Sequence, residues 1–239
     1  MALLTTIRIA GRFCGPPRFG NGGYTCGRLA GFLPGVVVVR LRTGAPLDID
    51  LRVEANGTEA RLFHEATLVA EARVATLDLE PPKAPTVDEA VAASRAAPGR
   101  VAHPLPRCFA CGPQREAGDG LRILPGPIPG RELVAAPWIP HAAFADGTGV
   151  RPEFVWAALD CPSGWAVGEA PEGSAILLGE LCARIDRPVL AGRQHVITGW
   201  PLAAEGRKRM AGAAIYSDSG QPLAVARATW IVVPRTALD

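Results

Sequence analysis

The pattern of apolar and polar residues predicts one strongly amphipathic helix, within the stretch Val150 to Ala166. Pro152 suits its first turn, because a residue in that position needs no N–H donor. Pro162, Ser163 and Gly164 favour a stop, so the helix is expected to end there. One acid, Asp160, lies beside the apolar stripe. That stripe consists of Phe154, Val155, Ala158 and Leu159.

Alternating or β-branched runs predict a set of strands in each half of the chain. In the first half the expected strands are Leu3 to Ala10, Val36 to Leu41, Asp48 to Glu54, Thr58 to Ala66 and Leu68 to Leu79. In the second half they are Leu121 to Leu124, Glu132 to Trp138, Ala175 to Ile185, Arg193 to Ala203, Lys208 to Ser217 and Leu223 to Val233. Asn56-Gly57 is a strong signal for a hairpin turn.

The two halves also resemble each other in sequence, which indicates an internal repeat. GGYTCGRLAG (Gly22 to Gly31) aligns with PEFVWAALDC (Pro152 to Cys161), so that a shorter helix is expected in the first half. The strand segments align as RLRTGAPL (Arg40 to Leu47) with ARIDRPVL (Ala183 to Leu190), and LVAEARVATLDLEPP (Leu68 to Pro82) with PLAVARATWIVVP (Pro222 to Pro234). Chance similarity of strands rich in Ala and Val is the alternative explanation.

The repeat suggests three parts of the chain. Residues 1–82 form the first repeat and residues 108–239 the second. The linker, residues 83–107, is rich in Pro and Ala and contains one short expected helix, Val87 to Ala97. Thr86 followed by Glu89 has the spacing of a capping box at its start.

The two aligned helices differ at positions whose side chains or backbone N–H groups could take part in catalysis. Asp160 stands where the first helix has Ala30, and Pro152 stands where the first helix has Gly22. Gly22 and Gly23 leave backbone N–H groups uncovered at a helix start, which suits an anion or a polarised carbonyl oxygen. One helix therefore offers donors and the other an acid, so a single site between them is expected. The alternative is that Asp160 is an exposed residue near a helix end.

Several stretches resemble the hotdog-fold thioesterase superfamily in its two-repeat, or double-hotdog, form. They are FGNGGYTCGRLAG (Phe19 to Gly31), CFACGPQREAGDGLRI (Cys108 to Ile123) and the helix that carries Asp160. In element order the resemblance covers nearly the whole chain. It implies an α+β fold in which each repeat is a central helix wrapped by an antiparallel sheet, and the repeats pair side by side.

The same resemblance implies an acyl-CoA thioesterase with one active site between the repeats. In that superfamily a Gly-Gly backbone N–H binds the thioester carbonyl and an acid activates water or attacks the thioester; the matching residues are Gly22, Gly23 and Asp160. Asn21 departs from the pattern, since relatives often have His there. The expected substrate-binding residues are Asn21, Tyr24, Phe154, Arg207 and Lys208. The acyl chain is expected between the helices, against Tyr24, Leu29, Phe154 and Leu159.

The cluster Arg207-Lys208-Arg209 is the densest run of positive charge. It suits the phosphates of a coenzyme A nucleotide, although a solvated hairpin end is the simpler explanation. A second functional reading is an acyl-CoA or acyl-carrier binding protein without hydrolysis. A third, hydration or dehydration of an enoyl thioester, pairs an acid with a His and ranks last, because neither expected helix contains His.

Composition and charge limit the classes of partner that the protein is expected to bind. The chain has 239 residues, 48% of them hydrophobic, and a formal net charge of +2 without a basic block, so neither nucleic acid nor a membrane is an expected partner. The opening residues lack the features of a signal peptide, and a cytoplasmic protein is expected. A homo-oligomer is expected from the resemblance alone.

The six cysteines are expected to be reduced. Cys108 and Cys111 form a C-x-x-C motif, which alone is weak evidence for zinc, because four ligands are usual and no second pair stands at suitable spacing. The sequence therefore favours a structured turn at this motif, and neither a metal nor a cofactor is expected.

Overall fold

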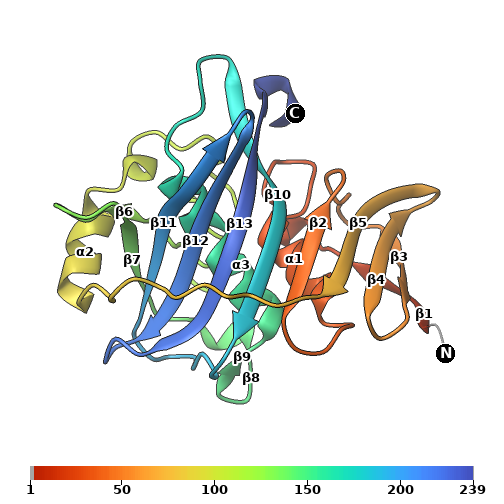
Figure 1. The fold of residues 1–239 in the computed structure, drawn as a ribbon, viewed down its shortest axis with the longest axis horizontal. Coiled ribbons are helices and arrows are strands. Elements are labelled where there is room, and N and C mark those ends of the chain that lie inside the picture. The colour runs from red at the N-terminus through yellow and green to blue at the C-terminus, as the bar shows by residue number, and fades with distance from the viewer. Residues whose placement is uncertain (1–2, 239) are drawn as a thin grey trace.

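One large antiparallel sheet runs through the whole molecule, and the central helices lie behind it (Figure 1). The computed structural model describes residues 3–238. Its main sheet has eleven strands in the order β1-β3-β4-β5-β2-β10-β13-β12-β11-β7-β6. The first half contributes β1 (Leu3–Arg8), α1 (Gly22–Ala30), β2 (Val37–Leu41), β3 (Asp50–Ala55), β4 (Glu59–His64) and β5 (Thr67–Val74). Within residues 3–238 no helix is long and apolar enough to cross a membrane.

The second half repeats this arrangement. Its elements are β6 (Gly126–Pro127), β7 (Val134–Trp138), β8 (Ala145–Asp146), β9 (Gly149–Val150), α3 (Pro152–Ala166), β10 (Ser174–Ile185), β11 (His195–Glu205), β12 (Lys208–Ser217) and β13 (Pro222–Pro234). Apart from β6, β8 and β9, each half runs strand, helix and then four strands. The sheet order β1-β3-β4-β5-β2 in one half matches β7-β11-β12-β13-β10 in the other. The halves join where β2 pairs with β10.

The strand register corrects one of the sequence alignments by one residue. Val39 pairs with Ala72, and Ala183 pairs with Ala226. Since Ala72 and Ala226 correspond, Val39 corresponds to Ala183, so the alignment that put Arg40 on Ala183 is wrong. Val39 and Ala183 both join the main core. A shift of one residue would turn one of them to the other face of its sheet.

Helix α3 does not end at Pro162 as expected, but continues to Ala166. The Ser163 hydroxyl donates to the Asp160 carbonyl oxygen at 2.6 Å and accepts a hydrogen bond from Trp230 Nε1 at 2.9 Å. A Cβ at Gly199 on β11 would collide with the Pro162 carbonyl, so the sheet presses directly on this turn. Tertiary packing therefore holds a helix that Pro162 weakens locally.

We expect Ser163→Ala to lower the free energy of unfolding by about 1–3 kcal/mol. Ser163 is fully buried, and its loss leaves the Trp230 indole N–H without its acceptor. Urea unfolding followed by circular dichroism measures the change. Ser219→Ala, at an exposed turn, is the control and should leave stability within about 0.5 kcal/mol of the parent; equal losses in both variants would contradict the prediction.

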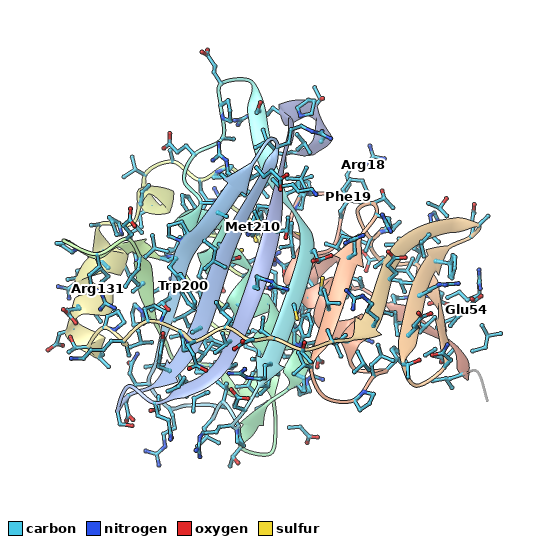
Figure 2. All side chains as sticks on the ribbon, in the orientation of Figure 1. Arg18, Phe19, Glu54, Arg131, Trp200 and Met210 are labelled. Carbon is cyan, nitrogen blue, oxygen red and sulfur yellow. The ribbon has the colours of Figure 1, made fainter. Side chains whose placement is uncertain are left out.

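The chain that follows β5, residues 75–86, crosses the outer face of the sheet, in front of β10, β13 and β12 (Figure 1). β5 ends at Val74, before the expected Leu79, because its partner β2 begins at Val37, which pairs with Val74. Beyond this point Leu77 packs on the outer face, and the Tyr216 hydroxyl donates to the Pro82 carbonyl at 2.7 Å. Trp200 and Met210 lie on the same face (Figure 2).

The linker helix forms as the sequence predicts. α2 spans Val87–Arg95, and both hydrogen bonds of the capping box between Thr86 and Glu89 are present. The predicted strand Leu121 to Leu124 is wrong, because the backbone N–H groups of Leu121 and Ile123 bond to the carbonyls of Phe109 and Ala110. β7 pairs instead with the short strand β6.

Candidate active site

Helices α1 and α3 cross in direct backbone contact. A Cβ at Gly23 would lie 2.5 Å from the Asp160 Cβ and 2.6 Å from the Trp156 carbonyl oxygen. One turn further along α1, a Cβ at Gly27 would lie 2.6 Å from the Glu153 Cα. The helices therefore run antiparallel, and glycine is required where they touch. This contact brings the N-terminus of α1 to the middle of α3.

Asp160 meets the start of α1 through one carboxylate oxygen. Its Oδ2 accepts a hydrogen bond from the Gly23 backbone N–H at 2.8 Å and from Asn21 Nδ2 at 2.9 Å. Asn21 Oδ1 in turn accepts from the Tyr24 N–H at 2.9 Å, which caps the helix. The structure thus brings together an acid and donors that stand well over 100 positions apart in the sequence.

Burial changes the acidity of Asp160. The residue is 2% exposed, and its Oδ1 is buried without a hydrogen-bond partner among the described residues. Desolvation raises the pKa of the carboxyl to about 7, against the lowering effect of the Gly23 N–H, while the nearby Cys108 raises it further and Asn21 lowers it. A carboxyl with this pKa is able to take up and release a proton near neutral pH.

Gly22 provides the donor that remains free. Its N–H makes no hydrogen bond within residues 3–238, whereas the Gly23 N–H is held by Asp160. Gly22 is partly exposed, and a Cβ there would meet the Leu178 side chain at 2.9 Å. A carbonyl oxygen could approach this N–H at the positive end of α1.

The space between the helices is filled. Tyr24 and Phe154 are each at most 2% exposed, and their ring centroids lie 5.6 Å apart. Phe13 stacks on Tyr24 at 4.3 Å, and Phe109 lies edge-on to Phe13 at 5.0 Å. Leu29 and Leu159 are fully buried. The acyl channel expected between the helices is therefore closed by aromatic packing, and Asn21, itself 2% exposed, acts as a cap rather than lining an open pocket.

A covering segment, defined here as Cys108 to Ile123, closes the site from outside. Its Phe109 N–H donates to the Cys14 carbonyl at 2.7 Å, so the segment lies on the loop before α1. A cavity of about 510 Å³ opens beside this contact. The cavity is lined by Gly11, Arg12, Cys14, Gly15, Pro17, Pro104, Leu105, Pro106, Arg107, Gln114, Arg115 and Asp119. A Cβ at Gly15 would lie 3.2 Å from the Asn21 Cα, so one layer of chain separates the cavity wall from Asp160.

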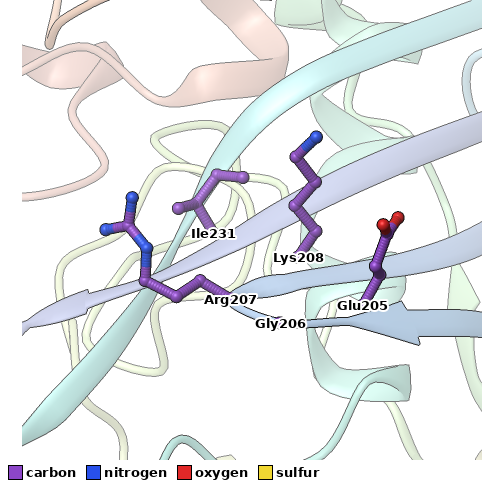
Figure 3. A pocket seen from close by; sticks show the side chains of 5 residues that line it. All are labelled: Glu205, Gly206, Arg207, Lys208 and Ile231. Atoms are coloured by element: carbon purple, nitrogen blue, oxygen red, sulfur yellow. The ribbon is translucent and has the colours of Figure 1, made fainter.

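Arg207 and Lys208 are not brought to Asp160. They line a shallow pocket of about 270 Å³ at the β11–β12 turn, with Glu205, Gly206 and Ile231 (Figure 3). Trp230 faces α3 through its bond to Ser163, so the next residue, Ile231, and its partner Lys208 face the opposite side of the sheet. A role for these two residues in binding substrate stays a prediction.

Comparison with solved structures identifies the architecture. No family model matches the chain, and no curated protein matches it in sequence. The structure is similar to a tesB protein of Mycobacterium avium subsp. paratuberculosis, with 13% identity, a TM-score of 0.61, and coverage of 97% of this chain and 93% of that one. A putative thioesterase of Novosphingobium aromaticivorans is also similar, with 13% identity, a TM-score of 0.62, and coverage of 95% of this chain and 94% of that one. The acyl-CoA thioesterase II TesB2 of Mycobacterium marinum has 11% identity and a TM-score of 0.61, and the match covers 97% of this chain and 93% of that one.

The chain has a double-hotdog fold. The fold class expected from the sequence is confirmed. In this double hotdog the two central helices come from opposite repeats, which explains why Asp160 and Gly23 meet across the repeat boundary. Sequence reasoning missed Ser163, whose hydroxyl binds the Asp160 backbone and Trp230 rather than the carboxylate. The sequence signal for this bond is the Ser three residues after Asp160, since a Ser hydroxyl in a helix can bond to the backbone carbonyl three or four residues earlier.

Proposed function

We propose that this protein is an acyl-CoA thioester hydrolase with one site, formed where α3 meets the start of α1. The observation that carries the proposal is the buried Asp160 carboxyl, held by donors of the opposite repeat and with a pKa near 7. The similarity to an acyl-CoA thioesterase II supports the substrate class, since the fold alone does not give function.

The proposed reaction uses water and the thioester. Asp160 takes a proton from water as the water oxygen attacks the thioester carbonyl, or its carboxylate attacks the carbonyl carbon directly. The carbonyl oxygen accepts a hydrogen bond from the Gly22 N–H, assisted by the positive end of α1. The C–S bond breaks, and the thiol and the carboxylic acid leave. Because Gly23 binds Asp160, it serves as a positioning residue in this scheme.

Substrate access requires the covering segment or the loop before α1 to move. The cavity of about 510 Å³ lies between these segments, and Arg12 and Arg107 line it. Guanidinium groups suit the phosphates of coenzyme A. We place the thiol carrier here and the acyl chain toward the aromatic cluster around Tyr24 and Phe154.

The first test is thiol release from short, long, branched and aromatic acyl-CoAs, followed with a chromogenic thiol reagent. We expect release above the uncatalysed rate for at least one acyl class. The alternative function is binding without hydrolysis, which the burial of the Asp160 carboxyl away from water favours. Binding alone predicts no thiol release, together with a rise in melting temperature when an acyl-CoA is added.

The turn residues Arg207 and Lys208 have a separate test. If they bind the nucleotide phosphates, the double change Arg207→Ser with Lys208→Ser should raise KM about tenfold for an acyl-CoA and leave KM for the matching acyl-pantetheine unchanged, as expected for the loss of about 1.4 kcal/mol of binding. Arg61→Ser with Arg73→Ser, on exposed strands of the first repeat, is the matched control. Equal KM values for parent and turn variant would remove these residues from the site.

A further inference from the structure

The fold gathers cysteine sulfurs that the sequence keeps apart. Cys108 and Cys111 of the covering segment and Cys161 of α3 have Sγ atoms that all lie within 4.8 Å of one another. The Cys108 and Cys161 sulfurs are 3.8 Å apart. All three side chains are buried, at 3%, 5% and 8% exposure, and all three are free thiols. Cys161 of α3 thus adds a third potential metal ligand to the two cysteines of the C-x-x-C motif.

The spacing of these sulfurs matches that of ligands on one metal ion. Zn–S bonds of about 2.3 Å in tetrahedral geometry place two sulfurs roughly 3.8 Å apart. A disulfide needs about 2.05 Å between its sulfurs. The observed 3.8 Å between Cys108 and Cys161 therefore fits two thiolates on a common zinc ion.

The local backbone fixes the motif for this purpose. The Gly112 N–H donates to the Cys108 carbonyl at 2.8 Å, which closes a tight turn around the motif. A Cβ at Gly112 would lie 2.5 Å from that carbonyl oxygen, so the turn requires glycine. Beside the sulfurs, Asn21 Nδ2 donates to Cys108 Sγ at 3.8 Å and stabilises negative charge on it. The turn points both motif sulfurs at α3, where Cys161 completes the group.

We propose that Cys108, Cys111 and Cys161 bind one Zn²⁺ ion as thiolates, with the fourth coordination position taken by a non-protein ligand. Soft thiolate ligands select zinc or Cu(I) over the hard ions Mg²⁺ and Ca²⁺. Each Zn–S bond replaces one S–H bond, and the three protons pass to solvent. The ion fastens the covering segment to α3 next to Asp160. The three ligands take no direct part in the proposed reaction, so the zinc content of the protein tests this site separately from thioester hydrolysis.

The test measures zinc in the full-length protein, purified without chelators and dialysed against metal-free buffer. We expect about one zinc per chain by plasma mass spectrometry, lost in Cys161→Ser. Cys182→Ser is the matched control, because Cys182 is also buried but lies on the outer face of the sheet. A mercurial reagent that blocks thiols should release the zinc of the parent to a metal-binding dye.

Cobalt substitution keeps the test valid if Cys161→Ser fails to fold. The parent protein, stripped of zinc and loaded with Co²⁺, should show thiolate-to-cobalt charge-transfer bands and the strong visible bands of a tetrahedral ion. The proposal is overturned if the zinc-supplemented parent retains less than about a tenth of an ion per chain, or if Cys182→Ser loses zinc as Cys161→Ser does. A disulfide among the three cysteines in the freshly purified parent also overturns it.

Discussion

Asp160→Asn should lower thiol release from the preferred acyl-CoA by a factor of about 10² to 10⁴. Asn keeps the size and polarity of the side chain, and its amide oxygen can still accept the hydrogen bonds from Gly23 and Asn21. It cannot take a proton from water or form an acyl-enzyme anhydride. The expected loss therefore falls on kcat, with the melting temperature measured alongside to confirm folding.

The control is Asp146→Asn, an exposed acid on the short strand β8. It should hydrolyse acyl-CoAs as fast as the parent. An Asp160→Asn variant that keeps the parental rate would remove Asp160 from the reaction. If neither the parent nor the variant releases thiol, and an acyl-CoA raises the melting temperature of both, the protein binds acyl-CoA without hydrolysing it.

A single turnover in ¹⁸O-labelled water identifies direct attack by Asp160 when water then opens the anhydride at the side-chain carbonyl. If the carboxyl acts as a base on water, the acid released in the first turnover carries the label. If it attacks the thioester directly and water then attacks the side-chain carbonyl of the anhydride, the label enters Asp160 and the first product is unlabelled.

Gly23→Ala is expected to lower the free energy of unfolding by about 3 kcal/mol or more. The new Cβ would lie 2.5 Å from the Asp160 Cβ and 2.6 Å from the Trp156 carbonyl oxygen, and neither atom belongs to the flexible end of a side chain. Relief requires the helices to move apart. For a chain of this size the melting temperature should fall by roughly 6–12 °C, and the hydrogen bond from Gly23 to Asp160 should weaken with it.

Gly22→Ala is the matched comparison, one residue earlier in the same helix. Its Cβ would meet Leu178 Cδ2 at 2.9 Å, the end of a side chain that can turn aside, and Leu178 Cβ at 3.1 Å, which a shift of a few tenths of an ångström relieves. Ala also favours the helical state over Gly by up to about 1 kcal/mol. Gly22→Ala should therefore cost much less stability than Gly23→Ala. Equal losses would show that the close crossing of α1 and α3 does not set the requirement for glycine at Gly23.

The sequence by itself determined much of the local structure, because local structure depends on neighbouring residues. Pro152 at the first turn of α3 and the capping box of Thr86 and Glu89 stand where they were predicted. β12 has the predicted bounds Lys208–Ser217, since a long run of strand-forming residues between turns has few alternatives. The comparison of the two repeats also singled out Asp160 as the position where they differ chemically.

Local rules failed where packing from a distant segment decided the outcome. Pro162 should end α3, but β11 and Trp230 hold the next turn in place. β5 stops at Val74 because β2 offers no further partner, although the residues after it suit a strand. The alignment of Arg40 on Ala183 followed residue type, and only the register showed which residues face the core.

The chemistry of the site depended most on the tertiary structure. The sequence could pair Asp160 with Gly22 or Gly23, but the helix crossing decides that Gly23 binds the carboxylate and leaves the Gly22 N–H free. No further metal ligands stand near the C-x-x-C motif at a suitable sequence spacing. Cys161 lies beside the motif only because the covering segment folds onto α3. Such contacts join residues whose separation along the chain carries no information about their distance. The packing of the two repeats, which buries their shared core, sets that distance.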